Sequence, residues 1–367
     1  MNSDQPPSKK ESSGISILSL PYDLLLNILA RVSRLYYPTL SLVSKTFRSV
    51  VASPDLYETR SLLHRTESCL YLCLRSHRPN LPDPIPYWFA LCRKPNRTVT
   101  DQTSRHLFIP IPSPHLRPAE SVVAVGSNIY KIGGYMSSSS RVSVLDCRFN
   151  TWHKAPRMRV KRRSPAASLL DGKIYVAGGC KDLNSDNWVE VFDPKTQTWG
   201  NVTNPGTERS RGGEVKSFGI EGKLYLLGKG DVVYDPEEAS WNPIGLGMDW
   251  AFAAFFVHGV IGGIMFFWDD VEFSWYDSKA NSWKTLNGVE DLPDFGGYCK
   301  MVDLGEKKMA VLWEGYVGSE KVIWCAQIAL ELRDGDEMWG NILWLDSVLT
   351  LQEPCHLVDA NVLSATV

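Results

Sequence analysis

The sequence lacks the features that would direct it to a membrane, to the secretory pathway or to a nucleic acid. Its longest apolar stretch, Trp250 to Trp268, is interrupted by His258 and by glycines, which fits two buried strands better than a membrane-spanning helix. The polar residues 1–14 show no basic start, apolar segment and cleavage site, so no secretory signal is expected. The formal net charge of -2 gives no general attraction to nucleic acids or anionic membranes. We therefore expect a protein of the cytoplasm, the nucleus or both, with residues 1–14 as a disordered tail.

Sequence motifs for catalysis and for metal binding are also missing. There is no Gly-x-Ser-x-Gly elbow, no P-loop and no His-Glu-x-x-His pair. Cys69 and Cys73 have no second close pair that would complete a zinc site, so the eight cysteines are expected to be reduced thiols in the core. His258 and His356 are isolated along the chain. We expect no enzymatic activity, no cofactor and no metal.

Among the features that are present, the first is a segment predicted to be helical, residues 15–64. Leu24, Leu25, Ile28, Leu29 and Val32 recur at helical spacing, with Pro21 suited to the first helical turn. A second apolar set from Leu40 to Val51 predicts a second helix. Ser53 and Pro54 then form an N-cap followed by proline, which predicts a third helix to about His64.

The remainder of the chain is built from short β-rich runs that repeat. The segment Ala124–Gly134 aligns with Leu169–Gly179 and with Gly219–Gly228, and each is followed by a strand, a turn and a tryptophan. The tryptophans at 152, 199, 241 and 283 are separated by 47, 42 and 42 residues. This spacing resembles the kelch unit of roughly 50 residues, and the resemblance covers about three-quarters of the chain.

The kelch resemblance implies a β-propeller over residues 65–367, in which each unit is a four-stranded blade. We expect glycine pairs such as Gly133-Gly134 to permit close backbone approach, and the tryptophans to fill gaps between blades. The Asp-Pro or Asp-Ser step before each tryptophan, as at Asp193, Asp235 and Asp277, is expected to make the turn between the third and fourth strands. A degraded unit extends from Met301 to Trp339, and residues 69–112 resemble a blade without its first strand. Residues 358–367 could supply that strand and close the ring, which removes free edges. Six blades is the best count, with five and seven as alternatives.

With the propeller placed, the helical segment resembles an F-box at Leu18–Val32 and Leu40–Arg48. The sequence is therefore similar to plant F-box/kelch-repeat proteins: a small all-α F-box module followed by an all-β kelch propeller. This resemblance implies docking to a Skp-type adaptor and, through it, to a cullin-RING ubiquitin ligase. The expected adaptor contacts, whose alternative role is packing on the propeller, are Leu20, Pro21, Leu24, Leu25, Ile28, Leu29, Leu40 and Val43.

The basic stretch at residues 157–163 is the strongest local charge signal in the propeller. It lies between two blades, in a connection that shares one face with the loops between second and third strands. It is either a solvated connection or part of an electropositive face that binds the substrate, an acidic segment in our hypothesis. The residues proposed for that face are Arg141, Arg159, Lys161, Arg163, Arg209, Arg211 and Trp250.

Two functions follow from these patterns. The first is the substrate-recognition subunit of a Skp–cullin–F-box (SCF) ubiquitin ligase, with an unknown protein as the target. The alternative is a kelch scaffold or propeller enzyme with a vestigial F-box. Adaptor binding separates them.

Overall fold

The computed structural model describes residues 17, 20–77, 83–94, 105–113, 119, 121–182, 185–206, 215–228, 231–244, 257–269, 271–280, 282–293, 295, 298–333, 336–352 and 354–367. The chain forms two compact units, Met1–Thr66 and Glu67–Val367, where the sequence placed the division after residue 64. The expected tail at residues 1–14 lies outside the described residues. No helix in the described part of the chain is long and apolar enough to cross a membrane.

The first unit is helical, as the apolar spacing predicts. It contains α1 (Tyr22–Ala30), the short 3-10 helix η2 (Arg34–Tyr36), α2 (Tyr37–Val43), α3 (Lys45–Val51) and α4 (Pro54–Leu62). Pro21 is the N-cap of α1 and thus lies one residue before the helix. The expected N-cap at Ser53 is confirmed, because its hydroxyl accepts a hydrogen bond from the Asp55 N–H at 3.2 Å.

The single second helix expected over residues 40–51 is instead two helices. Ser44 is extended, with φ -157° and ψ 161°, and separates α2 from α3. Its hydroxyl accepts a hydrogen bond from the Phe47 N–H at 3.1 Å and so caps α3. Leu40, Val43, Phe47 and Val50 keep helical spacing across the break, which is why the hydrophobic pattern alone did not reveal it.

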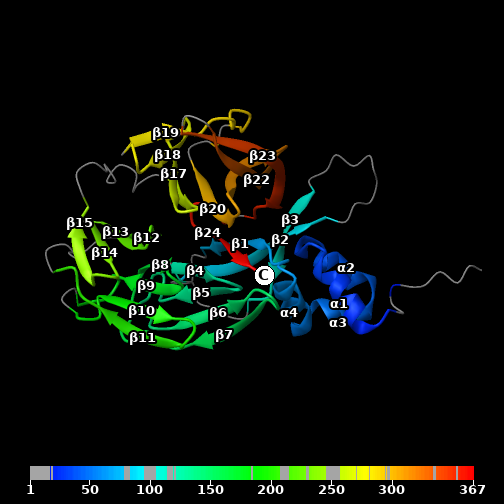
Figure 1. Ribbon diagram of the computed structural model, residues 1–367, viewed down its shortest axis with the longest axis horizontal. Helices are drawn as coiled ribbons and strands as arrows, with labels where there is room; N and C mark the ends of the chain where they lie inside the picture. The colour runs from blue at the N-terminus through cyan, green and yellow to red at the C-terminus, as the bar shows by residue number, and fades with distance from the viewer. Residues whose placement is uncertain are drawn as a thin grey trace, which may run out of the picture. The chain divides into compact units, whose positions relative to one another are not determined.

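The second unit is a six-bladed β-propeller, which confirms the predicted fold and blade count (Figure 1). The described residues form six antiparallel four-stranded sheets. Blade 1 consists of β24 (Asn361–Thr366), β1 (Ser68–Ser76), β2 (Ile85–Arg93) and β3 (His106–Ile111); blade 2 of β4 (Ser121–Val125), β5 (Asn128–Ile132), β6 (Val142–Asp146) and β7 (Thr151–Ala155); blade 3 of β8 (Ala166–Leu170), β9 (Lys173–Ala177), β10 (Val189–Asp193) and β11 (Thr198–Val202).

The remaining three blades follow the same order along the chain. Blade 4 consists of β12 (Lys216–Ile220), β13 (Lys223–Leu227), β14 (Val232–Asp235) and β15 (Ser240–Pro243); blade 5 of β16 (Val257–Ile261), β17 (Ile264–Trp268), β18 (Phe273–Asp277) and β19 (Ser282–Thr285); blade 6 of β20 (Cys299–Gly305), β21 (Lys308–Val317), β22 (Glu320–Arg333) and β23 (Glu337–Thr350). The longest apolar stretch supplies the two paired strands β16 and β17, as expected.

The ring is closed by the C-terminal strand. In Figure 1 the red β24 lies beside β1, and the register pairs Ser68 with Thr366 and Cys73 with Asn361. As the first strand of blade 1, β24 contacts the first strands β4 and β20 of the neighbouring blades. The C-terminal run therefore supplies the missing strand, as predicted. By pairing with β1, the C-terminal strand covers an edge of blade 1 that would otherwise be free.

The repeated aspartates and tryptophans have the structural roles expected of them. Asp193 and Asp235 each accept two backbone hydrogen bonds through Oδ1 and so close the turn between the third and fourth strands of their blades. The indole N–H of Trp199 donates to the Pro156 carbonyl at 3.0 Å, and that of Trp241 donates to the Thr203 carbonyl at 2.7 Å. Each bond reaches the residue that follows the fourth strand of the preceding blade, so the tryptophans join neighbouring blades.

Candidate functional site

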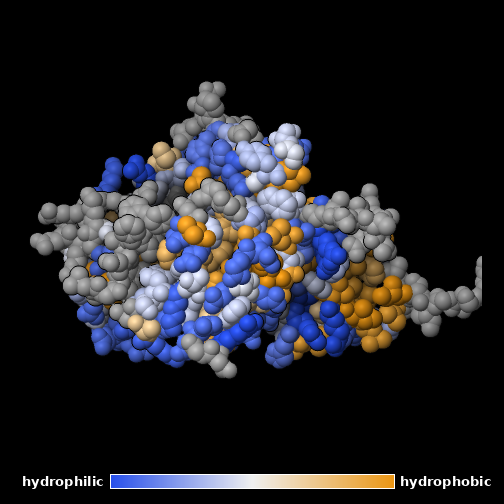
Figure 2. All heavy atoms as spheres, turned by 90° about the horizontal axis from the view of Figure 1, so that it is seen from above, coloured by the Kyte–Doolittle hydropathy of each residue, from blue (hydrophilic) through white to orange (hydrophobic). Residues whose placement is uncertain are grey.

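The first candidate surface is an apolar area on the helical unit. Leu24, Ile28, Leu42 and Val43 are 53%, 40%, 78% and 63% exposed, although all are large hydrophobic residues. Hydrophobic side chains gather over these helices in the space-filling view (Figure 2). An exposed apolar area of this kind is typical of a protein-binding surface. We call these four residues the apolar helical surface.

The structure divides the eight residues predicted to contact the adaptor into two groups. Pro21, Leu24, Ile28 and Val43 are exposed, and Leu20 and Leu40 are half-buried. Leu25 and Leu29 are only 3% and 2% exposed, so their side chains stabilise the fold and are not available for contact. The sequence prediction missed Leu42, whose position in the same apolar run as Val43 was the available signal.

A buried arginine holds the end of α1 in place. The Nη1 atom of Arg60, on α4, donates to the carbonyls of Ala30 at 3.2 Å and Val32 at 2.8 Å and to Tyr37 Oη at 3.0 Å. Its side chain is 2% exposed. The carbonyls at the C-terminal end of a helix lack helical hydrogen-bond partners and carry partial negative charge. The Arg60 guanidinium supplies both the missing donors and a compensating positive charge. Arg60 thereby fixes α1, which carries part of the apolar helical surface.

The second candidate surface is one end of the propeller. Because strand direction alternates within each blade, the second strand ends, the third begins and the fourth ends at this end of the propeller. In the connection after β7, the Arg162 carbonyl accepts hydrogen bonds from the N–H groups of Gly134 at 3.2 Å and Ser139 at 3.0 Å. The Arg163 N–H donates to the Gly179 carbonyl at 2.8 Å. The basic stretch therefore joins the loops of blades 2 and 3, and we call this end the loop face.

The glycine pairs make this junction possible. Gly179 has φ +71°, and a Cβ there would lie 2.4 Å from the Arg163 carbonyl oxygen. A Cβ on Gly134 would overlap the Ser137 carbonyl oxygen. The close backbone approach that the sequence predicts for such pairs is confirmed, since only glycine fits these positions.

The basic stretch is not uniformly solvated, because Arg162 is completely buried. Its Nη1 donates to the carbonyls of Gly178 at 2.6 Å and Trp188 at 3.0 Å, and its Nη2 donates to the Asn187 carbonyl. The same Nη2 lies 3.1 Å from Oε2 of Glu190, and both side chains are 0% exposed. Arg162 and Glu190 therefore form an interior ion pair that anchors the connection to blade 3.

Arg159 is also engaged with blade 3, although its side chain is exposed. Its backbone N–H donates to Oε1 of Glu190 at 2.8 Å, and its Nη2 donates to the Trp199 carbonyl at 2.8 Å. Its Nη1 donates to Oδ1 of Asn201. Reversing the charge of Arg159 would therefore disturb the fold as well as the surface.

Three of the residues predicted to bind the substrate are exposed cations on the loop face. Arg141, Lys161 and Arg163 are exposed, and the backbone hydrogen bonds described above bring their segments together. The Gly133 N–H also donates to the Arg141 carbonyl at 3.1 Å. Arg209, Arg211 and Trp250 lie outside the described residues.

A buried lysine adds to the charge in this region. Burial lowers the pKa of Lys131, on β5, to about 8; the Cys73 thiol opposes this shift and the Arg141 guanidinium adds to it. Burial also raises the pKa of Cys73 to about 12, so this thiol stays protonated at neutral pH. Seven of the eight cysteines are buried and the eighth, Cys180, is half-buried. Among the residues that the structure describes, no group of histidine, cysteine and acidic side chains could hold a metal ion.

The two surfaces define a class of protein. A helical module with an exposed apolar surface is joined in one chain to a propeller, and profile comparison matches the F-box domain to residues 17–59 and the FKB95 kelch-repeats domain to residues 88–349. An F-box implies binding of a Skp-type adaptor, and a kelch propeller implies binding of a protein. The combination is that of an F-box substrate adaptor.

Full-length similarity shows the family. F-box/kelch-repeat protein At4g39590 of Arabidopsis thaliana is 50% identical over 397 aligned positions, which cover 100% of this chain and 96% of the relative. F-box/kelch-repeat protein At4g39580 of the same plant is 49% identical over 383 positions, covering 100% of both chains. At4g39550, with the same description, is 48% identical over 98% of this chain and 97% of its own. The chain belongs to the F-box/kelch-repeat family.

Proposed function

We propose that this chain is the substrate-recognition subunit of an SCF-type ubiquitin ligase. The apolar helical surface would dock on a Skp-type adaptor and, through it, on a cullin-RING ligase, while the propeller holds the target protein. The observation that carries the proposal is the exposure of Leu24, Ile28, Leu42 and Val43 on a helical F-box unit. The chain would recruit its target and leave the chemistry of ubiquitin transfer to other subunits. We propose the cytoplasm, the nucleus or both as its location.

The docking role predicts a sharp loss of adaptor affinity from two surface substitutions. Replacing Leu24 and Val43 together by serine removes apolar side chains that are more than half exposed in the free chain. Because a few apolar anchors dominate such interfaces, we expect the affinity for the Skp-type adaptor to fall about 100-fold. The measurement is isothermal titration of the purified full chain with the adaptor.

The matched control is Leu62→Ser, which alters a leucine that is 75% exposed at the end of α4, outside the predicted contact. It should bind the adaptor as the unaltered chain does. A subsequent assembly with cullin and RING subunits tests the ligase step. Failure of the unaltered chain to bind any Skp-type adaptor would overturn the proposal and favour a kelch scaffold.

We further propose that the loop face binds an acidic segment of the target. Lys161→Glu and Arg163→Glu together should weaken binding of a fluorescent dodecapeptide rich in Asp and Glu about tenfold, since two attractions become repulsions. Arg159 is left unaltered because its side chain supports blade 3. Fluorescence anisotropy with the full chain at low ionic strength is the measurement, and added salt should weaken the binding.

Lys173→Glu with Lys195→Glu makes the same change of charge at the other end of blade 3, where both lysines are exposed. This control pair should leave peptide binding unchanged. Equal losses in the two double variants would show a non-specific charge effect and would contradict a defined acidic-segment site on the loop face.

A further inference from the structure

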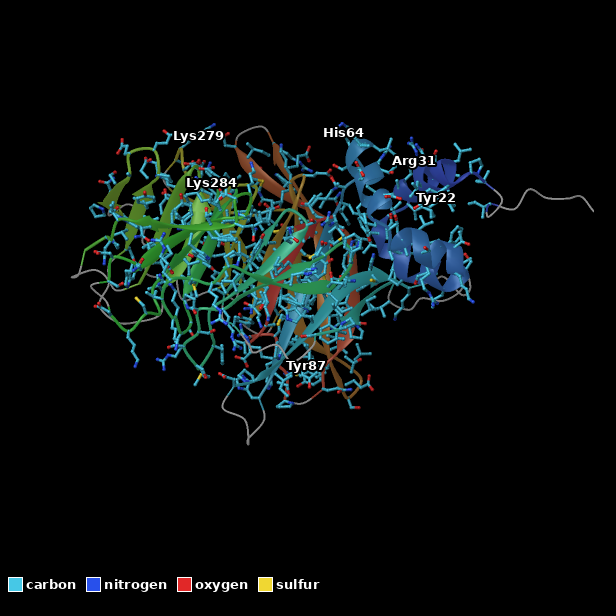
Figure 3. All side chains as sticks on the ribbon, turned by 90° about the horizontal axis from the view of Figure 1, so that it is seen from below. Tyr22, Arg31, His64, Tyr87, Lys279 and Lys284 are labelled. Atoms are coloured by element: carbon cyan, nitrogen blue, oxygen red, sulfur yellow. The ribbon has the colours of Figure 1, made fainter. Side chains whose placement is uncertain are left out.

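A cavity opens between blades 5 and 6 at the end of the propeller opposite the loop face. Its volume is about 260 Å³, and it is lined mainly by apolar side chains: Ile261, Ile264, Trp275, Leu330, Leu332 and Met338. It lies among the turns that join first to second and third to fourth strands. In Figure 3 the labelled Lys279 and Lys284 of blade 5 lie at this end, far from Tyr87 at the other end.

One wall of the cavity exists because blade 6 is longer than the other blades. Strands β22 and β23 have 14 residues each, whereas β17 and β18 of blade 5 have 5 each. In the extended hairpin, Leu332 is paired with Met338 and Leu330 with Gly340. Since residues two apart in a strand share a face, Leu330, Leu332 and Met338 form one apolar surface against blade 5. Leu332 remains 50% exposed on it.

Trp275, on β18, contributes an aromatic wall to the cavity. Its side chain is 5% exposed and its indole N–H is enclosed by protein, so the contact that it offers is apolar.

Side chains of both charges line the cavity, namely Asp277, Asp336, Lys279 and Lys307. Lys284 lies next to this lining, because its Nζ is 2.6 Å from Oδ2 of Asp277 and donates to the Asp336 carbonyl at 3.4 Å. The hydrogen bond from Lys284 holds the pKa of Asp277 below its usual range. Lys279 and Lys307 also line the cavity, and neither has an ion-pair partner in the described part of the chain. Because Lys284 offsets Asp277, Lys279 and Lys307 outnumber the one remaining carboxylate of the lining, Asp336, and the balance of charge favours an anion.

We propose that this cavity binds a small, flat, apolar anion such as an aromatic carboxylate. An apolar cavity of about 150 Å³ accommodates one benzene ring, so 260 Å³ is sufficient for two fused rings with a short polar group. The rings would lie against Leu330, Leu332 and Met338. The carboxylate would face Lys279 and Lys307. This site is separate from both surfaces of the proposed ligase function and does not depend on that function.

The probe is 2-naphthoate, titrated into the full chain by ligand-observed NMR and calorimetry. We expect binding with a Kd of about 1 mM or tighter, the range set by ligand efficiency for a molecule of this size. Leu332→Trp should fill the cavity and weaken binding at least tenfold. The matched control, Leu343→Trp, alters a leucine that is 46% exposed on β23 but does not line the cavity, and should leave binding unchanged.

The charge requirement is tested by comparison with neutral 2-naphthylmethanol. The unaltered chain should prefer 2-naphthoate, and Lys279→Gln with Lys307→Gln should remove that preference while both compounds still bind. Absence of 2-naphthoate binding at 10 mM, or equal weakening by Leu332→Trp and Leu343→Trp, would overturn the site. A preference for the carboxylate that survives the lysine changes would overturn the assignment to an anion.

Discussion

Replacing Glu190 by alanine is expected to lower the free energy of unfolding of the propeller by about 3–5 kcal/mol. Glu190 and Arg162 are both 0% exposed and lie 3.1 Å apart. Removing the carboxylate leaves a guanidinium in the interior with no counter-charge. The Arg159 N–H loses its acceptor in the same change. A loss of this size is a large fraction of the stability of a domain.

The measurement is urea unfolding of the full chain followed by tryptophan emission. All 13 tryptophans lie in Glu67–Val367, so the signal reports the propeller alone. Glu237→Ala removes an exposed acidic residue from a turn of blade 4 and should change stability by less than about 0.5 kcal/mol. The double change Arg162→Met and Glu190→Leu should be less damaging than Glu190→Ala, because no charge remains unpaired. A loss below about 1 kcal/mol for Glu190→Ala would contradict the role of the pair.

Replacing Arg60 by methionine is expected to destabilise the end of α1 by about 2–3 kcal/mol. The substitution keeps much of the apolar stem but removes the hydrogen bonds to the carbonyls of Ala30 and Val32. Those buried carbonyls then lose a charged donor at the negative end of the helix dipole. The amides of α1 should exchange with deuterium about 30- to 150-fold faster, and adaptor affinity should fall although Arg60 is not on the surface.

Hydrogen exchange of peptides that cover α1 measures this local effect without relying on tryptophan. Arg31→Met is the matched control at the same end of α1, because Arg31 is exposed and its Nε donates to Oδ1 of Asn27 on the same helix at 3.0 Å. It should leave exchange nearly unchanged. If Arg60→Met and Arg31→Met behaved alike, the anchoring role of Arg60 would be wrong.

The fold was largely readable from the repeats. The tryptophan period gave the blades, the aspartates before Trp199 and Trp241 marked the turns, and the unpaired partial blade required the C-terminal strand. These features are predictable because a blade is a local unit, whose turns and strand pairs form between neighbours in the sequence. Helices α1 and α4 were predictable for the same reason.

The details that depend on contacts between residues distant in the sequence could not be predicted from the sequence. Spacing alone did not show that Leu25 and Leu29 are buried while Leu24 and Ile28 remain exposed. Arg162 belongs to a run of basic residues, but its side chain is buried. It donates hydrogen bonds to Glu190, 28 positions away, and to three carbonyls of blade 3. Arg60 is likewise buried and donates to the carbonyls of Ala30 and Val32, which are distant in the sequence.

By itself, then, the sequence determined the two modules, the repeated blade with six as the best count, and the face on which the basic residues lie, since each rests on local periodicity or on the strict alternation of strand directions. Only the tertiary structure decided which charged and apolar side chains are exposed, and it alone showed the cavity beside Trp275. Burial depends on what packs against a residue from other blades or helices, and a cavity depends on several strands ending at one place. Neither is encoded in the spacing of any single segment.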